Sequence, residues 1–225
     1  MQIRKLQPPQ EGKTFWTVQL ENGHALQIGE GEVVSFGLYA GMELEEDQLS
    51  ALQEAAARSA VRIRALDLLS ARPLSRKELL QKLTARPRQN PGRSNQPPRP
   101  AVKAEDAQAV ADWLEDLGYL DDAAYARSVV QHYAAKGYGP RRLQDELFRR
   151  GVDREHWDQA LETLPEPDNA IDAFLQKRLG GQEALDRKDL KRASDALVRR
   201  GFRYEEIRDG LRRYEEFLEE QENPF

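Results

Sequence analysis

Basic side chains recur at matching places in three related segments of the chain. The segments span residues 76–86, 140–151 and 190–201, and each is predicted to form one helix. One cation stands in the first turn of each predicted helix: Lys77, Arg141 and Lys191. A second stands at its end: Arg86, Arg150 and Arg200. Guanidinium and ammonium groups bind phosphates and carboxylates, so the chemistry these residues support is recognition of anionic groups on a partner.

The two sets of cations differ in their local energetics. A cation in the last turn of a helix interacts favourably with the helix dipole, by about 0.3–1 kcal/mol, so we interpret the second set as structural. A cation in the first turn opposes the dipole. In the first segment a capping box of Ser75 and Glu78 is expected to offset this cost. In the second, Gly139-Pro140 begins the helix and Arg141-Arg142 follow at once, without visible compensation.

Two interpretations of the first-turn arginines remain open from the residues alone. Arginine side chains beside the free amides of a helix N-terminus would suit a phosphate or a carboxylate of a partner. Ordinary solvated surface is the other interpretation, because exposed arginines are common.

Other kinds of chemistry lack the residues that they require. The chain has no cysteine, which excludes disulfides and thiolate catalysis and fits a reducing cytoplasm. Its three histidines, His24, His132 and His156, are scattered, so we expect no metal site. No GxxxxGK[ST] motif occurs, so nucleotide hydrolysis has no support. We therefore expect a binding protein without catalytic residues or cofactors.

Charge is distributed unevenly along the 225 residues. The net charge is −5, yet residues 51–104 carry 12 basic and 3 acidic side chains, whereas residues 105–170 carry 7 and 15. This alternation fits a partner with its own charge pattern, or a localised contact with a polyanion, better than general coating of nucleic acid. No apolar run approaches the ~20 residues of a membrane span, and we expect neither a membrane segment nor a signal peptide.

The first fifty residues are predicted to form strands. Thr14–Leu20 and Ala25–Ile28 are rich in β-formers and flank Asn22-Gly23, which favours a type I′ hairpin turn. The run Val33–Phe36 predicts a further short strand, and Gly29-Glu30-Gly31 before it is interpreted as a turn. We expect a sheet of two or three strands, which is too small to be stable alone and packs on the helices that follow.

The rest of the chain is helical and repeats itself. Apolar residues align in the three segments named above: Leu79 with Leu143 and Ala193, and Leu83 with Leu147 and Leu197. Gly151 and Gly201 align after the helix, as expected for a residue that ends a helix in the left-handed conformation. The flanking helices align too, which predicts three repeats of a three-helix unit stacked into an elongated, curved array.

These patterns predict four segments. An N-terminal β region covers 1–49, and the three helical repeats cover 50–118, 119–164 and 165–225. Glu45, Glu46 and Asp47 are expected to cap the helix that they precede, and Asp121-Asp122 the first helix of the second repeat. A stretch rich in proline and arginine, 84–103, interrupts the first repeat and is expected to be a mobile linker.

Several motifs resemble the RecX family of recombinase regulators. They are GYLDDAAYA at 118–126, KGYGPRRL at 136–143, the Glu146–Val152 helix end and LVRRGF at 197–202, and the resemblance covers about 50–217. It implies a cytoplasmic, non-enzymatic modulator of RecA that acts in DNA recombination, DNA repair and the SOS response. We expect a monomer. The expected partner is the RecA filament on single-stranded DNA, and the DNA itself is a further candidate.

The resemblance and the charge register together suggest residues for the contact surface. These candidates are Lys77, Tyr138, Arg141, Arg142, Arg149, Arg150, Lys191 and Arg192. Two other functions remain open: a helical module that binds single-stranded DNA without sequence preference, which predicts a steep salt dependence, and a generic protein-interaction scaffold.

Overall fold

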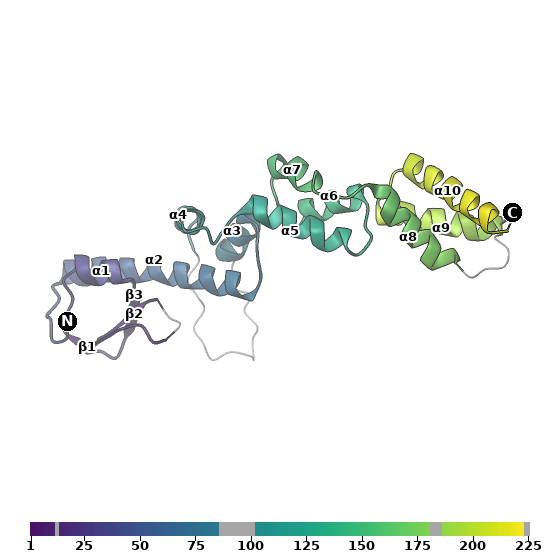
Figure 1. Ribbon diagram of the computed structural model, residues 1–225. Helices are drawn as coiled ribbons and strands as arrows, with labels where there is room; N and C mark the ends of the chain where they lie inside the picture. Colours follow the sequence, from purple (N-terminus) through teal and green to yellow (C-terminus); the bar gives the residue numbers. More distant parts are fainter. Residues whose placement is uncertain (12–13, 86–101, 181–185, 223–225) are drawn as a thin grey trace, which may run out of the picture. The chain divides into compact units, whose positions relative to one another are not determined.

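The computed structural model describes residues 1–11, 14–85, 102–180 and 186–222 (Figure 1). The chain forms two compact units. One comprises Met1–Pro73 and Leu79–Tyr119, and the other comprises Leu74–Glu78 and Leu120–Phe225. The division into four segments stays a prediction. Most of the expected linker, and Arg86 with it, lies outside the described residues.

The first unit contains a three-stranded antiparallel sheet of order β1-β2-β3, formed by Ile3–Gln7, Trp16–Leu20 and Ala25–Ile28. The central strand pairs Val18 with Leu6 on one side and Leu26 on the other. The last two strands were predicted, but β1 was not, because its sequence IRKLQ holds two charges and few β-formers.

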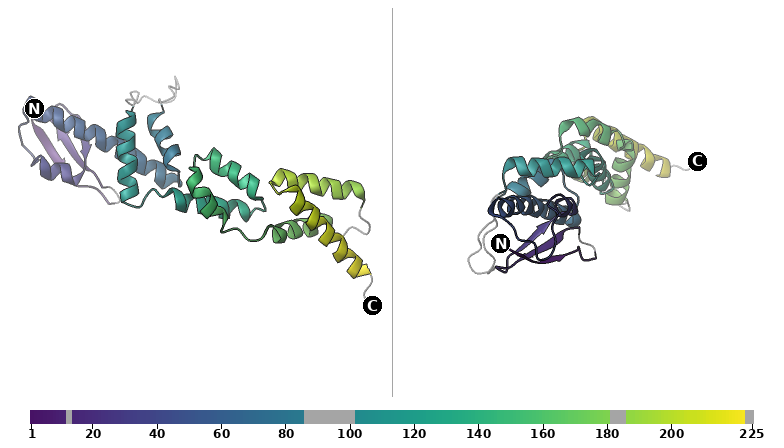
Figure 2. Two further views of the ribbon diagram at one scale, coloured as in Figure 1. Left: turned by 90° about the horizontal axis from the view of Figure 1, so that it is seen from above. Right: turned by 90° about the vertical axis from the view of Figure 1, so that its left-hand side faces the viewer.

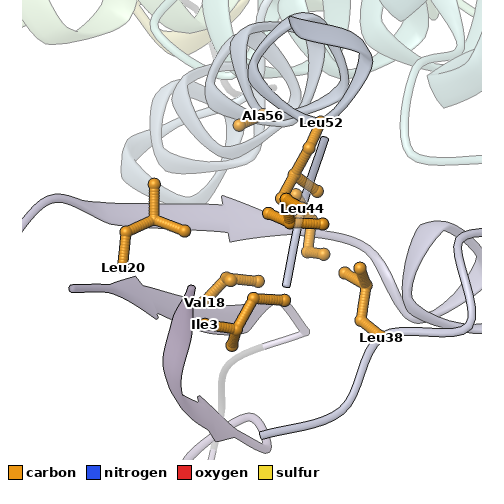
Figure 3. Packing of buried hydrophobic residues seen from close by; sticks show 8 residues of the cluster. Ile3, Val18, Leu20, Leu38, Leu44, Leu52 and Ala56 are labelled. Atoms are coloured by element: carbon orange, nitrogen blue, oxygen red, sulfur yellow. The ribbon is translucent and has the colours of Figure 1, made fainter. Parts of the chain in front are cut away.

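The sheet packs on the long helix α2, Glu46–Ala71, as predicted (Figures 2 and 3). Ile3, Val18 and Leu20 from the strands are buried together with Leu52 and Ala56 of the helix. This shared core explains how so small a sheet is stabilised, since each buried aliphatic side chain contributes about 1.5–3 kcal/mol.

The prediction of a strand at Val33–Phe36 is wrong. Residues Glu30–Ser35 form the helix α1, and the interpretation of Gly29-Glu30-Gly31 as a turn is wrong with it. The Val33 N–H donates to the Gly29 carbonyl, and acidic residues occupy the first turn, where they interact favourably with the helix dipole. Val34 is 75% exposed, so the apolar run does not form a buried strand.

The hairpin turn lies one residue earlier than predicted. The Gly23 N–H donates to the Leu20 carbonyl, so the central residues of the turn are Glu21 and Asn22. Gly23 follows with φ of 84°, and the Asn22 side chain accepts from the His24 N–H. The asparagine therefore stabilises the loop through its side chain, and Gly23 supplies a positive φ.

Two shorter helices accompany α2. They are α3, Arg76–Thr84, and α4, Ala104–Asp116. The predicted acidic start of α2 is confirmed, with Glu45 and Gln48 forming a capping box. In the first unit, α4 packs on α2, and the Arg62 guanidinium lies 5.1 Å from the ring centroid of Trp113.

The second unit holds two further helical cores (Figure 1). The first is built from α5, Asp122–Ala134, α6, Pro140–Arg149, the 3₁₀ turn η1, Arg154–His156, and α7, Trp157–Leu161. The second is built from α8, Pro167–Leu179, α9, Arg187–Arg200, and α10, Tyr204–Glu222. The predicted mainly helical fold with a small N-terminal sheet is confirmed.

The details that the repeat predicted for this unit are also confirmed. The aligned apolar residues of α6 and α9 are fully buried, and Asp121 caps α5 by accepting from the Ala124 N–H. Gly151 and Gly201 adopt φ of 70° and 93°. Across the part of the chain described, no helix combines the length and apolarity that crossing a membrane requires.

Candidate functional site

The first turn of α6 is hydrogen-bonded to the end of α9. The Gly139 N–H donates to the Arg200 carbonyl at 2.8 Å, and the Arg141 N–H donates to the Gly201 carbonyl at 3.2 Å. We call this contact the α6–α9 joint. Of the two interpretations left open, the one in which free amides bind a phosphate does not hold for Gly139 and Arg141, because carbonyls at the end of α9 already accept from both N–H groups.

A related joint connects the start of α3 to the end of α6, within the second unit. Ser75 is buried; its hydroxyl donates to the Arg150 carbonyl at 2.5 Å and accepts from the Glu78 N–H at 3.1 Å. The Lys77 stem lies so close to Gly151 that a Cβ there would meet it at 3.2 Å. Ser75 and Arg150 align with Gly139 and Arg200, so a related contact occurs twice, with a serine hydroxyl donating in the one and a backbone N–H in the other.

The joints supply the compensation that the sequence did not reveal. The end of a helix carries a partial negative charge from its unpaired carbonyls. Lys77 and Arg141 each stand in a first turn that lies against such an end. Their unfavourable interaction with the dipole of their own helix is therefore offset by the dipole of the next one, and a partner is not needed to explain them.

Arg150 has a structural environment. Its guanidinium donates to the hydroxyls of Tyr125 at 3.0 Å and Tyr133 at 3.2 Å, and it lies over the Tyr133 ring. Partial burial lowers the pKa of Arg150, but the hydrogen bonds to the two tyrosines outweigh it, so the pKa lies above its ordinary value. The side chain fastens the end of α6 to α5, as expected for a cation that ends a helix.

Arg200 takes a different internal position at the α6–α9 joint. It donates to the carbonyls of Lys136 and Gly137, both at 3.0 Å, and lies 4.8 Å from the centroid of the Phe174 ring. It also lies 5.7 Å from the ring centroid of Tyr138. Arg200 therefore connects the loop before α6 to α8.

Three predicted residues, Tyr138, Arg142 and Arg149, are connected along α6 through Arg142 and Glu146. The Arg142 guanidinium lies 6.0 Å from the ring centroid of Tyr138 and 3.3 Å from a carboxylate oxygen of Glu146. The same oxygen lies 3.4 Å from Arg149. The Glu146 side chain is 4% exposed, whereas that of Arg149 is 61% exposed. A buried carboxylate thus holds two cations that remain partly open to solvent.

The remaining candidates lie on exposed helix surface. Arg141 and Lys191 are exposed, and neither side chain has a bonding partner among the described residues. Arg192 pairs with Asp189 at 3.2 Å. The prediction that Lys191 stands in a first turn is wrong, because α9 begins at Arg187 and Lys191 and Arg192 follow its first turn. Both residues lie in the N-terminal half of α9, away from the joint. The predicted residues therefore do not form one cluster.

Glu146 is a central residue that sequence reasoning did not place in the site. Its spacing could have identified it, because it lies four residues after Arg142 and three before Arg149, the separations at which side chains meet on a helix. Its burial could not be predicted in this way. No group of side chains in the described part of the chain is arranged to hold a metal ion.

Comparison with known proteins connects this arrangement to one family. The model of the second three-helix domain of RecX matches residues 121–161, which contain α5, α6 and α7. The Regulatory protein RecX of Xanthomonas axonopodis pv. citri (strain 306) is 37% identical over 151 residues, covering 66% of this chain and 84% of the relative. That of Stenotrophomonas maltophilia (strain R551-3) is 36% identical over 151 residues, with coverage of 66% and 83%.

Two solved structures share the fold. A crystal structure of regulatory protein RecX aligns with a TM-score of 0.64 at 22% identity, and it covers 92% of this chain and 98% of that one. The crystal structure of RecX from Lactobacillus salivarius aligns with a TM-score of 0.53 at 21% identity, covering 71% and 97%.

Proposed function

Because this chain belongs to the RecX family, we propose that it is a non-enzymatic regulator that binds the RecA–single-stranded DNA filament and changes its assembly and ATP hydrolysis. One observation carries the proposal: this chain matches 84% of the length of a relative that is named a regulatory protein. On this proposal the chain acts in the cytoplasm, as a monomer, in recombination and DNA repair.

The surface of α6 supports a role in binding. Arg141 and Arg149 are exposed cations on a helix that is held at both ends by the joints, so little conformational freedom of the helix is lost when a partner binds. We propose Tyr138, Arg141, Arg142 and Arg149 as the centre of the contact surface, with Lys77, Lys191 and Arg192 as further contacts. The guanidinium of Arg150 is bonded to two tyrosines within the protein. We therefore propose that Arg150 supports the contact surface by holding α6 in place.

The test is an ATPase assay on RecA-coated single-stranded DNA. Added at amounts below one molecule per RecA protomer, the protein is expected to change the rate of ATP hydrolysis. An unchanged rate across a wide concentration range would contradict the proposal. Binding to naked single-stranded DNA is measured alongside as a function of salt. Tight binding with a steep salt slope and no additional effect on the filament would instead support a DNA-binding module.

A further inference from the structure

The strand β1 contains a β-bulge that changes which of its side chains face the same way. Two steps along β1, from Ile3 to Lys5, correspond to a single step along β2, so Arg4 is an extra residue in the ladder. In a regular strand, successive side chains point to opposite faces of the sheet. The extra residue shifts this alternation, because Ile3 and Leu6 stand three positions apart and both pack in the core shared with α2. Arg4 and Lys5, which lie between them, are both left exposed.

The face of the sheet turned away from α2 is polar and carries no acidic side chain (Figures 1 and 2). We call it the open face. Residues that pair across neighbouring strands share a face, so the ladder fixes its members. They are Arg4, Lys5, Gln7, Thr17, Gln19, Ala25 and Gln27. The members on the two edge strands are exposed, and the two on the central strand are half-buried.

The charge of the open face is opposite to that of the surrounding N-terminal region. Residues 1–50 contain eight acidic side chains and three basic ones. All eight acids lie outside the strands, whereas two of the three cations, Arg4 and Lys5, stand beside each other on the open face. Neither has a bonding partner within the part of the chain that the structure describes. The open face therefore complements a negatively charged ligand.

Protection of the sheet edge explains only part of this arrangement. The strand β1 lies at an edge, where bulges and lysines prevent pairing with a strand of another chain. A charge of either sign serves that purpose, so protection does not account for the absence of acids. The central strand β2 needs no such protection, yet Thr17 and Gln19 continue the uncharged polar surface across it.

The side chains of the open face suit a phosphate backbone. Arginine, lysine, threonine and glutamine are among the residues that hydrogen-bond to phosphate and sugar oxygens in nucleic acids. The open face has no large apolar side chain, such as anchors a protein interface, and no aromatic ring on which an unpaired base could stack. A duplex keeps its bases stacked inside and presents its backbone outside. We propose that the open face binds the phosphate backbone of duplex DNA without sequence preference.

The experiment removes the two cations from the full-length protein. The variant is Arg4→Gln with Lys5→Gln, and the matched control is Arg58→Gln with Lys103→Gln, which removes two exposed cations from the same unit outside the sheet. Fluorescence anisotropy measures binding to a duplex oligonucleotide, and to one of its single strands, as a function of salt. Melting temperature and gel filtration report the fold and the aggregation state of each variant.

Loss of two phosphate contacts should lower the slope of log affinity against log salt by about 1.8 for the duplex. Binding should weaken by about tenfold, equally for duplexes of different sequence. The control variant should bind as the wild type does. A second variant, Gln19→Glu, places a carboxylate at the centre of the open face and should also weaken duplex binding, whereas Gln53→Glu on the exposed surface of α2 should not.

Four results would overturn the inference. They are a wild type that does not bind the duplex, open-face variants that bind it as the wild type does, an equal loss in the control variant, and tighter binding of the single strand with the same dependence on Arg4 and Lys5. Aggregation of the double variant with unchanged duplex binding would assign the two cations to edge protection instead. Because the assay contains no RecA, its outcome is independent of the function proposed above.

Discussion

The backbone N–H of Gly139 donates a 2.8 Å hydrogen bond to the carbonyl oxygen of Arg200, and this bond joins the start of α6 to the end of α9. The contact is close because neither side has bulk at this point. A Cβ on Gly139 would meet the Gly201 carbonyl carbon and the Phe202 nitrogen at 2.7 Å. The joint therefore depends on a glycine at position 139 for space, and on Gly201 for a left-handed backbone.

Replacing Gly139 tests this dependence. We expect Gly139→Ala to lower the free energy of unfolding by about 1–3 kcal/mol, because a backbone contact cannot yield as a flexible side chain can. Urea denaturation measures the change. The matched control is Gly31→Ala, where a Cβ would meet nothing within 4 Å. Equal stability of the two variants would show that the joint tolerates the extra methyl group.

The bonds of Arg150 to Tyr125 and Tyr133 predict a structural phenotype. Arg150→Met should lower the free energy of unfolding by about 1–3 kcal/mol, since two tyrosine hydroxyls in partly buried positions lose their donor. Arg141→Met removes an exposed guanidinium without a partner among the described residues, and it should leave thermal stability unchanged. If the Arg150 variant and the wild type have the same melting temperature, the guanidinium is not needed for the stability of the fold.

Charge reversal should separate the neighbours Arg141 and Arg142. Arg142→Glu places a carboxylate beside the buried Glu146, so we expect a loss of at least about 1 kcal/mol in the free energy of unfolding. Arg141→Glu should fold normally and weaken binding to the RecA filament. Denaturation and filament binding are measured on both variants. A stable Arg142→Glu protein would contradict the role assigned to Glu146.

Tyr214 predicts a pH dependence for the core formed by α8, α9 and α10. Burial raises the pKa of Tyr214 above its ordinary value of 10.0, so the folded state holds the phenolic proton more tightly than the unfolded chain. The resulting stability is complete below the unfolded pKa and is lost as the pH rises through the folded pKa. Urea denaturation should therefore show the wild type losing stability relative to Tyr214→Phe above about pH 10. If the difference in the free energy of unfolding between the two proteins does not change with pH, the Tyr214 hydroxyl ionises equally readily in the folded and unfolded states.

Helices whose formation depends on residues close together in the sequence could be predicted. The spacing of Leu143 and Leu147, repeated in α9, indicated two helices with one buried stripe, and Gly151 and Gly201 marked where these helices end. The strand at Val33–Phe36 was not predicted correctly. A short apolar run of this kind is compatible with a strand or with a helix. In the structure the Val33 N–H donates to the Gly29 carbonyl, which is a helical hydrogen bond.

The sequence by itself determined the repeat, the helical fold and the first-turn positions of Lys77 and Arg141, but not that of Lys191, because α9 begins earlier than predicted. Only the tertiary structure decided what those cations do. Arg141 opposes the dipole of its own helix, and the carbonyls that offset it belong to Gly201 and its neighbours, in another helix. A pattern within one helix reports interactions within that helix, whereas electrostatic compensation between helices depends on which ends meet in space.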